Sequence, residues 1–82
     1  MEGSTLDRLL ERLRALREHH GLTQEEFAEI SGMSYKHYQA VEAGRKPDLR
    51  LSTLERLAGA YGIEVAELLG NRSPKTKIIG RC

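Results

Sequence analysis

The sequence predicts an all-α domain of five short helices. Apolar residues recur three and four residues apart in successive segments, which is the spacing of a helix with one buried face. Between these segments stand Ser and Thr residues that favour helix starts and glycines that favour helix ends. A chain of 82 residues fits one domain with a small core.

The first helix is predicted over residues 4–20. Ser4 is its expected cap, and Gly21 ends it. Its apolar stripe consists of Leu6, Leu9, Leu10, Leu13 and Leu16. His19 and His20 stand in the last turn, where partial positive charge is favourable. Both are expected at the surface, because neither has a partner at metal-ligand spacing.

The second helix is predicted to begin after Thr23. Glu26, three residues later, can close a capping box with Thr23. Leu22 and Phe27 have the spacing of a hydrophobic staple around the same start.

A third helix is predicted to follow a tight turn at Gly32. Ser34 is its expected cap, and it runs to Ala43 and stops at Gly44. Two short helices joined by such a turn form a helix-turn-helix, whose second helix lies in the DNA major groove. An ordinary helical hairpin is the alternative.

Helical spacing also predicts which side chains of this unit turn inward. They are Phe27, Ala28, Met33, Tyr38 and Val41. The Tyr38 ring should face the core, with its hydroxyl reaching an edge. The residues left facing out are Tyr35, Lys36, His37, Gln39 and Ala40. Their side chains suit contacts with base edges and phosphates, and a solvated surface is the alternative for each.

The fourth helix is predicted to start at Ser52, with Glu55 at capping-box distance. Gly62 stops it, and a short fifth helix follows over residues 64–69. Residues 71–82 form a basic tail whose composition cannot sustain a packed element alone.

Composition and charge limit the possible functions. The net charge is +1, but residues 1–33 carry four Lys or Arg against seven Asp or Glu, and residues 34–82 carry nine against five. The basic excess therefore begins at the proposed recognition helix. Cys82 is the single cysteine, which excludes a disulfide or zinc framework. Neither a membrane span nor a signal peptide is expected, which favours a cytoplasmic protein. No enzyme, cofactor, metal or small-molecule ligand is expected.

Three segments resemble the phage repressor and Cro-like (Xre-type) DNA-binding domains. They read G-L-T-Q-E-E-F-A-E-I-S-G-M-S, Y-Q-A-V-E-A-G, and L-E-R-L-A-G-A-Y-G-I followed by E-L-L. The resemblance covers about Leu9 to Leu69. It implies a five-helix repressor-like bundle over residues 1–70 that binds operator DNA, usually as a dimer.

The resemblance also implies roles for individual residues. Gln24 would bridge the DNA backbone and the recognition helix. Arg17 and Glu42 would form a structural ion pair. Basic side chains of the loop after the third helix should meet phosphates. The expected DNA-contacting set is Gln24, Ser34, Tyr35, Lys36, His37, Gln39, Ala40, Arg45, Lys46 and Arg50.

A dimer contact is expected near the end of the domain. Its expected residues are Ile63, Val65, Leu68 and Leu69, extended by Ile78 and Ile79 of the tail. The alternative is a disordered tail and a dimer that forms only on DNA.

The predicted function is a sequence-specific regulator of transcription, a dimeric repressor that places helix 34–43 in the major groove of double-stranded DNA. The alternative is a protein-interaction module of the same fold. The modest net charge and the acidic second helix favour that alternative.

Overall fold

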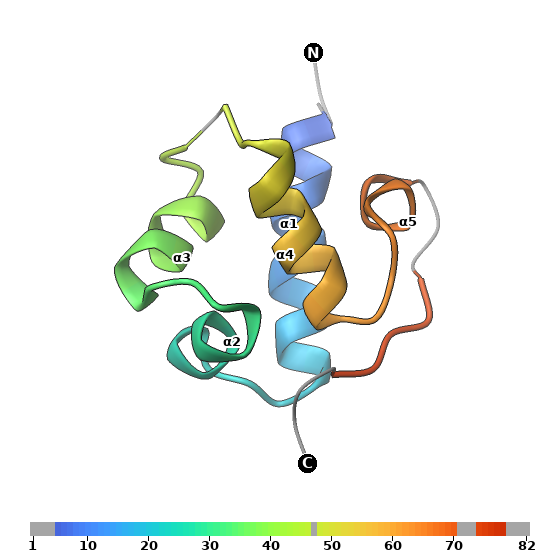
Figure 1. The fold of residues 1–82 in the computed structure, drawn as a ribbon, viewed down its shortest axis with the longest axis horizontal. Helices are drawn as coiled ribbons and strands as arrows, with labels where there is room; N and C mark the ends of the chain where they lie inside the picture. Colours follow the sequence, from blue (N-terminus) through green and yellow to red (C-terminus); the bar gives the residue numbers. More distant parts are fainter. Residues whose placement is uncertain (1–4, 47, 71–73, 79–82) are drawn as a thin grey trace.

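The computed structural model describes residues 5–46, 48–70 and 74–78. In chain order it contains α1 (Thr5–His19), α2 (Gln24–Ser31), α3 (Tyr35–Glu42), α4 (Leu51–Ala60) and α5 (Val65–Leu69) (Figure 1). The described residues form helices, turns and loops but no strand. The all-α prediction is therefore confirmed.

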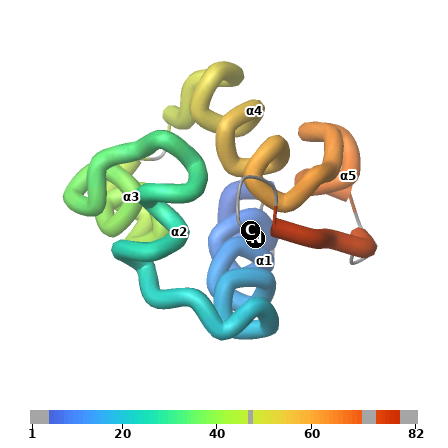
Figure 2. Tube along the Cα trace, turned by 60° about the horizontal axis from the view of Figure 1, so that its bottom comes forward, coloured from blue at the N-terminus to red at the C-terminus, as the bar shows by residue number. Residues whose placement is uncertain are grey.

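The helices form one bundle around a common core. In Figure 1, α4 lies in front of α1, with α2 and α3 on one side of this pair and α5 on the other. Figure 2, turned by 60°, shows the same separation of α2 and α3 from α5. Helix α2 packs against α3 and α4, while α1 packs against α3 and α5.

Aromatic rings occupy the centre of this core. Phe27 stacks on Tyr61 with ring centroids 4.7 Å apart and meets the edge of Tyr38 at 5.1 Å. All three rings are fully buried. Around them lie the buried aliphatic side chains Leu9, Leu13, Leu16, Leu22, Val41, Leu57 and Leu68. The few aromatic residues thus contribute more to the core than their number suggests.

The helix-turn-helix has the predicted local signals. Thr23 caps α2 and closes a capping box with Glu26. Gly32 ends α2 in the left-handed region at φ 76°, which reverses the chain for the turn. The Ser34 hydroxyl then accepts a hydrogen bond from the His37 amide at 3.0 Å and caps α3.

The predicted start of the fourth helix was wrong. Helix α4 begins at Leu51, and Arg50 occupies the cap position without a side-chain cap. The Arg50 carbonyl already accepts hydrogen bonds from the amides of Thr53 and Leu54. Ser52 therefore lies inside the first turn, where it cannot form the predicted capping box with Glu55.

Arg12 ties the first helix to the last. Its guanidinium donates hydrogen bonds to the carbonyls of Glu67, Leu68 and Gly70 at 3.2, 2.9 and 2.7 Å. These carbonyls lie at the end of α5, where no further helical turn can satisfy them. One arginine thus stabilises the end of a helix more than 50 residues away in the chain.

Residues 74–78 lie against the bundle. The Lys77 amide donates to the Tyr61 carbonyl at 3.1 Å, and Ile78 is half-buried against the core. His20 forms a 2.8 Å hydrogen bond with the Thr76 hydroxyl and stacks on Tyr61. The prediction of a plain surface residue was therefore wrong for His20, because the returning chain packs over it. Ile79 lies outside the described residues.

Candidate nucleic-acid interface

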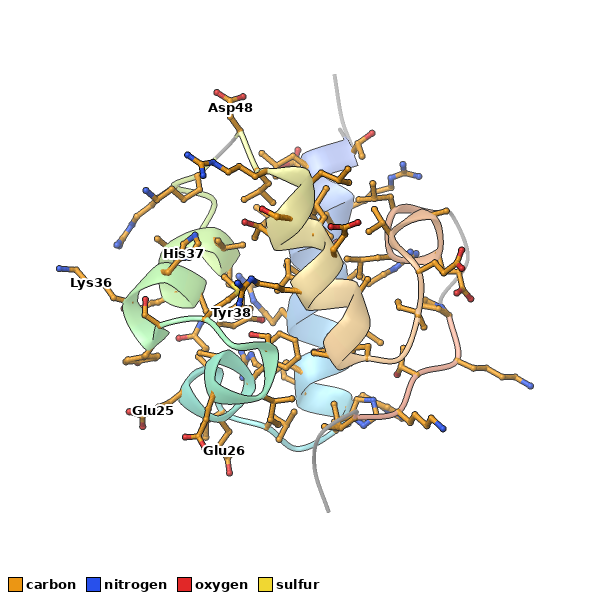
Figure 3. All side chains as sticks on the ribbon, viewed as in Figure 1. Glu25, Glu26, Lys36, His37, Tyr38 and Asp48 are labelled. Carbon is orange, nitrogen blue, oxygen red and sulfur yellow. The ribbon has the colours of Figure 1, made fainter. Side chains whose placement is uncertain are left out.

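The outer face of α3 presents polar and aromatic side chains to solvent. Tyr35 is 44% exposed, and Lys36, His37 and Gln39 are also exposed. Ala40 is half-buried. Lys36 extends away from the body of the protein in Figure 3. Because Ser34 caps the helix, these groups stand on a well-defined first turn and the turn after it.

The inner face of the same helix is locked into the core. Tyr38, Val41 and Glu42 are buried, and they recur at the spacing of one helical face. This face fixes the direction in which the outer side chains point. Helix α3 can therefore present its outer face to a partner without ordering new structure first.

Glu42 is the polar centre of this arrangement. Its Oε1 accepts hydrogen bonds from Arg17 Nη2 at 2.9 Å and Gln24 Nε2 at 3.0 Å. Its Oε2 accepts from Arg17 Nε at 3.0 Å and the Tyr38 hydroxyl at 2.6 Å. The Tyr38 hydroxyl therefore lies inside the protein, and the prediction that it reaches an edge was wrong. The buried carboxylate attracts it inward.

These contacts shift the pKa values of Glu42, Arg17 and Tyr38. Burial raises the pKa of Glu42, but hydrogen bonds from Arg17, Tyr38 and Gln24 outweigh it and hold the pKa below its ordinary value. The hydrogen bond to Glu42 raises the pKa of Arg17. Burial, followed by the bond to Glu42, raises the pKa of the Tyr38 hydroxyl. Glu42 and Arg17 therefore stay charged at neutral pH.

Gln24 joins the start of α2 to the end of α3. It is the first residue of α2, and its amide nitrogen donates to Glu42 on the last turn of α3. The family resemblance implies that Gln24 reaches the third helix as well as the DNA backbone, but it does not name Glu42 as the partner. The hydrogen bond restricts the side chain, although one N–H of the amide remains for another acceptor.

The loop between α3 and α4 carries the remaining predicted phosphate contacts. Arg45, Lys46 and Arg50 are exposed there. Asp48 is exposed in the same loop and points away from α3 in Figure 3. This carboxylate offsets part of the positive charge of the loop.

The predicted dimer residues differ in how deeply the structure buries them. Leu68 and Ile63 are buried in the core of their own chain, whereas Val65 and Leu69 are half-buried. Leu68 is therefore unavailable to a second copy in this conformation. The fifth helix points Leu68 inward because it must cover α1 and α4.

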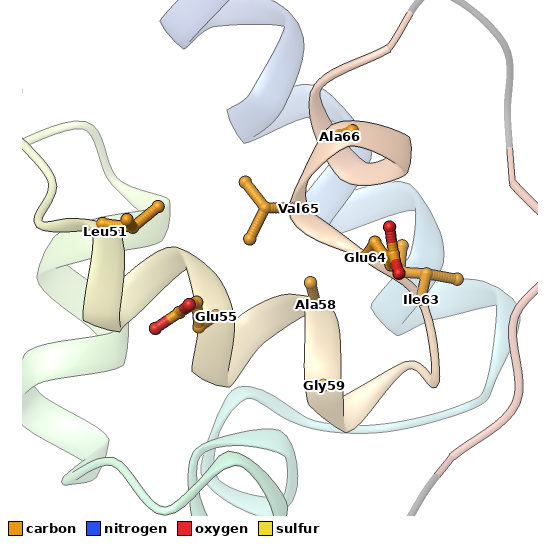
Figure 4. Close-up of a pocket in the computed structure, with 8 residues that line it drawn as sticks. All are labelled: Leu51, Glu55, Ala58, Gly59, Ile63, Glu64, Val65 and Ala66. Atoms are coloured by element: carbon orange, nitrogen blue, oxygen red, sulfur yellow. The ribbon is translucent and has the colours of Figure 1, made fainter.

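An open groove of about 380 Å³ lies between α4 and α5 (Figure 4). Ala58, Gly59, Val65 and Ala66 line it together with Leu51. Leu51 is 64% exposed. Sequence reasoning missed Leu51, because it was assigned to a loop rather than to the first turn of α4.

The described part of the chain has neither a candidate metal site nor a candidate membrane-spanning helix. No group of three or more His, Cys, Asp or Glu residues there could hold a metal ion. None of the helices described is long and apolar enough to cross a membrane.

Comparison with known proteins agrees with this geometry. A helix-turn-helix family model matches residues 13–68, which include α2, α3 and α4 in full. The chain is also 36% identical over 63 residues to an immunity repressor protein of Bacillus phage phi105. That match covers 77% of this chain and 43% of the phage protein, so the chain spans less than half of its relative. The chain belongs to the helix-turn-helix family of the Xre type, the family of phage repressors and Cro-like proteins.

Proposed function

We propose that this protein is a sequence-specific, DNA-binding regulator of transcription and acts as a repressor. The observation that carries the proposal is the division of α3 into two faces. Its outer face exposes Tyr35, Lys36, His37 and Gln39, while its inner face is fixed by Tyr38 and Glu42. A rigid helix with exposed hydrogen-bonding groups suits the major groove.

The exposed groups have complementary tasks in this proposal. Lys36 donates to guanine O6 and N7, and Gln39 pairs with adenine. Arg45, Lys46 and Arg50 contact phosphates on the flanking backbone, which positions the protein without reading sequence. Ala40 is half-buried and small, so it offers the bases less surface than its exposed neighbours, and its proposed contact is with a thymine methyl.

We propose further that two copies bind a two-fold DNA site. One recognition helix buries too little surface for tight specific binding, and two helices about 34 Å apart would reach successive turns of DNA. The groove between α4 and α5 is the proposed contact, because Leu51 supplies an exposed apolar side chain next to a hollow. Small and aliphatic residues line this hollow together with the carboxylates of Glu55 and Glu64. In a two-fold contact each copy offers both parts.

The first test is binding of the full chain to double-stranded DNA at several salt concentrations. Fluorescence anisotropy with a mixed-sequence duplex should show affinity that falls steeply with salt, because phosphate contacts release counterions. Selection of bound sequences from a random DNA pool should then yield a two-fold motif. Absence of salt-dependent binding, with no motif selected, would refute the proposed function.

A protein-interaction module of the same fold remains the second candidate. Its support is the acidic surface of α2, where Glu25, Glu26 and Glu29 are exposed beside the recognition helix. Figure 3 shows Glu25 and Glu26 extending from α2 on the side away from Asp48 and the loop. This candidate predicts salt-insensitive, weak retention on heparin and no selected DNA motif.

A further inference from the structure

We infer that Arg14 contacts a phosphate of the DNA backbone and so makes the first helix part of the interface. The inference rests on the proposed DNA-binding function and adds a residue and an element to the expected interface. The family resemblance assigned contacts to α2, α3 and the loop that follows, and none to α1 apart from the Arg17 ion pair.

Two arginines lie beside the Glu42 carboxylate, and they differ in exposure and in hydrogen bonding. The Arg17 side chain is 13% exposed, and its guanidinium donates twice to Glu42 and once to the Leu22 carbonyl. The Arg14 side chain is 58% exposed, and its Nε lies 3.8 Å from Glu42 Oε1. That distance is too long for a hydrogen bond.

Glu42 has no hydrogen-bond acceptor site left for Arg14. Each of its oxygens already accepts two hydrogen bonds, from Arg17 and Gln24 on one side and from Arg17 and Tyr38 on the other. A carboxylate offers about four acceptor sites. The cluster therefore contains two guanidinium charges for one carboxylate, and the exposed guanidinium keeps donors for another anion.

The exposed charge of Arg14 lies close to Gln24. Oxygen Oε1 of Glu42 lies near Arg14 Nε and also accepts the Gln24 amide. The distance from Arg14 Nε to Gln24 Nε2 is therefore no longer than the sum of these two contact distances. Gln24 is the residue that the family resemblance places at the DNA backbone. A phosphate held near Gln24 would come within reach of the Arg14 guanidinium.

Acidic neighbours restrict the direction of approach. Arg14 lines an open hollow of about 340 Å³ together with the acidic residues Asp7, Glu11 and Glu42 and with one further basic residue, Arg8. Asp7 and Glu11 stand nearer the start of α1, away from the turn that carries Arg17. A phosphate would therefore meet Arg14 from the side of Gln24, where the charge of Glu42 is already compensated by Arg17.

The test measures the salt dependence of binding to a mixed-sequence DNA duplex by the full chain and by Arg14→Ala. The slope of log affinity against log salt is negative, and loss of one phosphate contact should make it shallower by about 0.9. The affinity at low salt should fall about tenfold, as expected for one charged hydrogen bond. The matched control is Lys75→Ala, which removes one exposed positive charge from the opposite, tail-bearing part of the chain.

Arg14→Lys keeps the charge and should keep most of the slope, whereas Arg14→Gln should behave like Arg14→Ala. Thermal melts identify any variant that loses its fold, and the Lys variant still tests the inference in that event. Equal slopes for Arg14→Ala and Lys75→Ala would overturn the inference, and so would weaker binding with an unchanged slope. Failure of the wild-type chain to bind DNA would instead refute the proposed function.

Discussion

Glu42 shows how one residue supports both the fold and the candidate interface. It is buried, yet it stays ionised because donors from α1, α2 and α3 surround it. Such a group stabilises the protein only while its partners are present, because an unpaired buried charge is strongly destabilising. Helix α3 is therefore held in place by a charge network as well as by apolar packing.

Replacing one member of this network should destabilise the protein more than replacing two. We expect Glu42→Leu to lower the free energy of unfolding by about 3–5 kcal/mol, since Arg17 then loses its partner. Arg17→Met should act in the same direction. Urea melts of both variants and of the double variant would check this. Losses that simply add in the double variant would show that the two side chains do not interact.

Tyr35 and Lys36 provide the residue-scale test of recognition. Tyr35→Ala and Lys36→Ala should each weaken binding to a selected DNA site by about 1–3 kcal/mol, because a base contact is lost. Both side chains are exposed, so melting temperatures should stay close to that of the wild type. The control is again Lys75→Ala. Unchanged affinity in both variants would contradict the assignment of this surface.

His20 should make stability depend on pH. Burial, and secondarily the charge of His19, lowers the pKa of His20 in the folded protein. The unfolded chain therefore binds the proton more readily, so the stabilisation is complete above the ordinary pKa of about 6.5 and is lost as pH falls through the lower folded value. Urea melts at successive pH values should show the wild type weakening on acidification.

His20→Gln should reduce this loss, because glutamine can still bond Thr76 but does not titrate. His37→Gln, at an exposed position of α3, serves as the control for one fewer histidine. Identical pH profiles for the wild type and His20→Gln would show that protonation of His20 has no part in stability.

At the scale of elements, the turn between α2 and α3 sets the geometry of the candidate interface. Gly32 adopts φ 76°, and an added Cβ would lie 3.0 Å from Arg56 Nη1. Arg56 itself donates to the Gly32 carbonyl, which fastens α4 to this turn. The left-handed backbone conformation favours glycine here, and an added Cβ would in addition displace the Arg56 guanidinium slightly.

Two glycine substitutions should therefore have opposite effects. Gly32→Ala should destabilise the protein by about 1–2 kcal/mol, because alanine resists the left-handed region. Gly59→Ala should stabilise it by about 0.5–1 kcal/mol, because Gly59 lies within α4 and a Cβ there meets nothing within 4 Å. Thermal and urea melts would measure both. Equal shifts of the same sign would contradict the conformational argument.

At the scale of the whole molecule, the described part of the tail belongs to the bundle. Lys77 and Ile78 contact the same chain through the Tyr61 carbonyl and the core. The groove beside Leu51, which Glu55 and Glu64 also line, is the surface that we propose for contact with a second copy. Stability and self-association should therefore depend on different residues.

Leu51→Lys and Ile78→Ser should separate these two properties. We expect Leu51→Lys to make the chain monomeric in sedimentation with little change in melting, because Leu51 is largely exposed. Ile78→Ser should lower the free energy of unfolding by about 1 kcal/mol, since a half-buried apolar side chain is lost, and leave the dimer intact. A wild-type chain that stays monomeric at high micromolar concentration would rule out a pre-formed dimer.

The sequence by itself determined the helices and the turn between α2 and α3. Capping signals at Thr23 and Ser34 and the glycine at position 32 act within a few residues, so they can be read from a short stretch of chain. The period of apolar residues likewise identified the inner face of α3. The same local reasoning misplaced the start of α4, where Arg50 takes the cap position without a side-chain bond.

Only the tertiary structure decided the contacts between distant segments. Arg12 meets the end of α5, Gln24 meets Glu42, and His20 meets Thr76 across 56, 18 and 56 residues of chain, respectively. The Arg17–Glu42 pair was anticipated through family resemblance, because no local spacing indicates it. Helix signals depend on neighbours in the chain, whereas the partners of a buried charge depend on how the helices pack, which one sequence does not display.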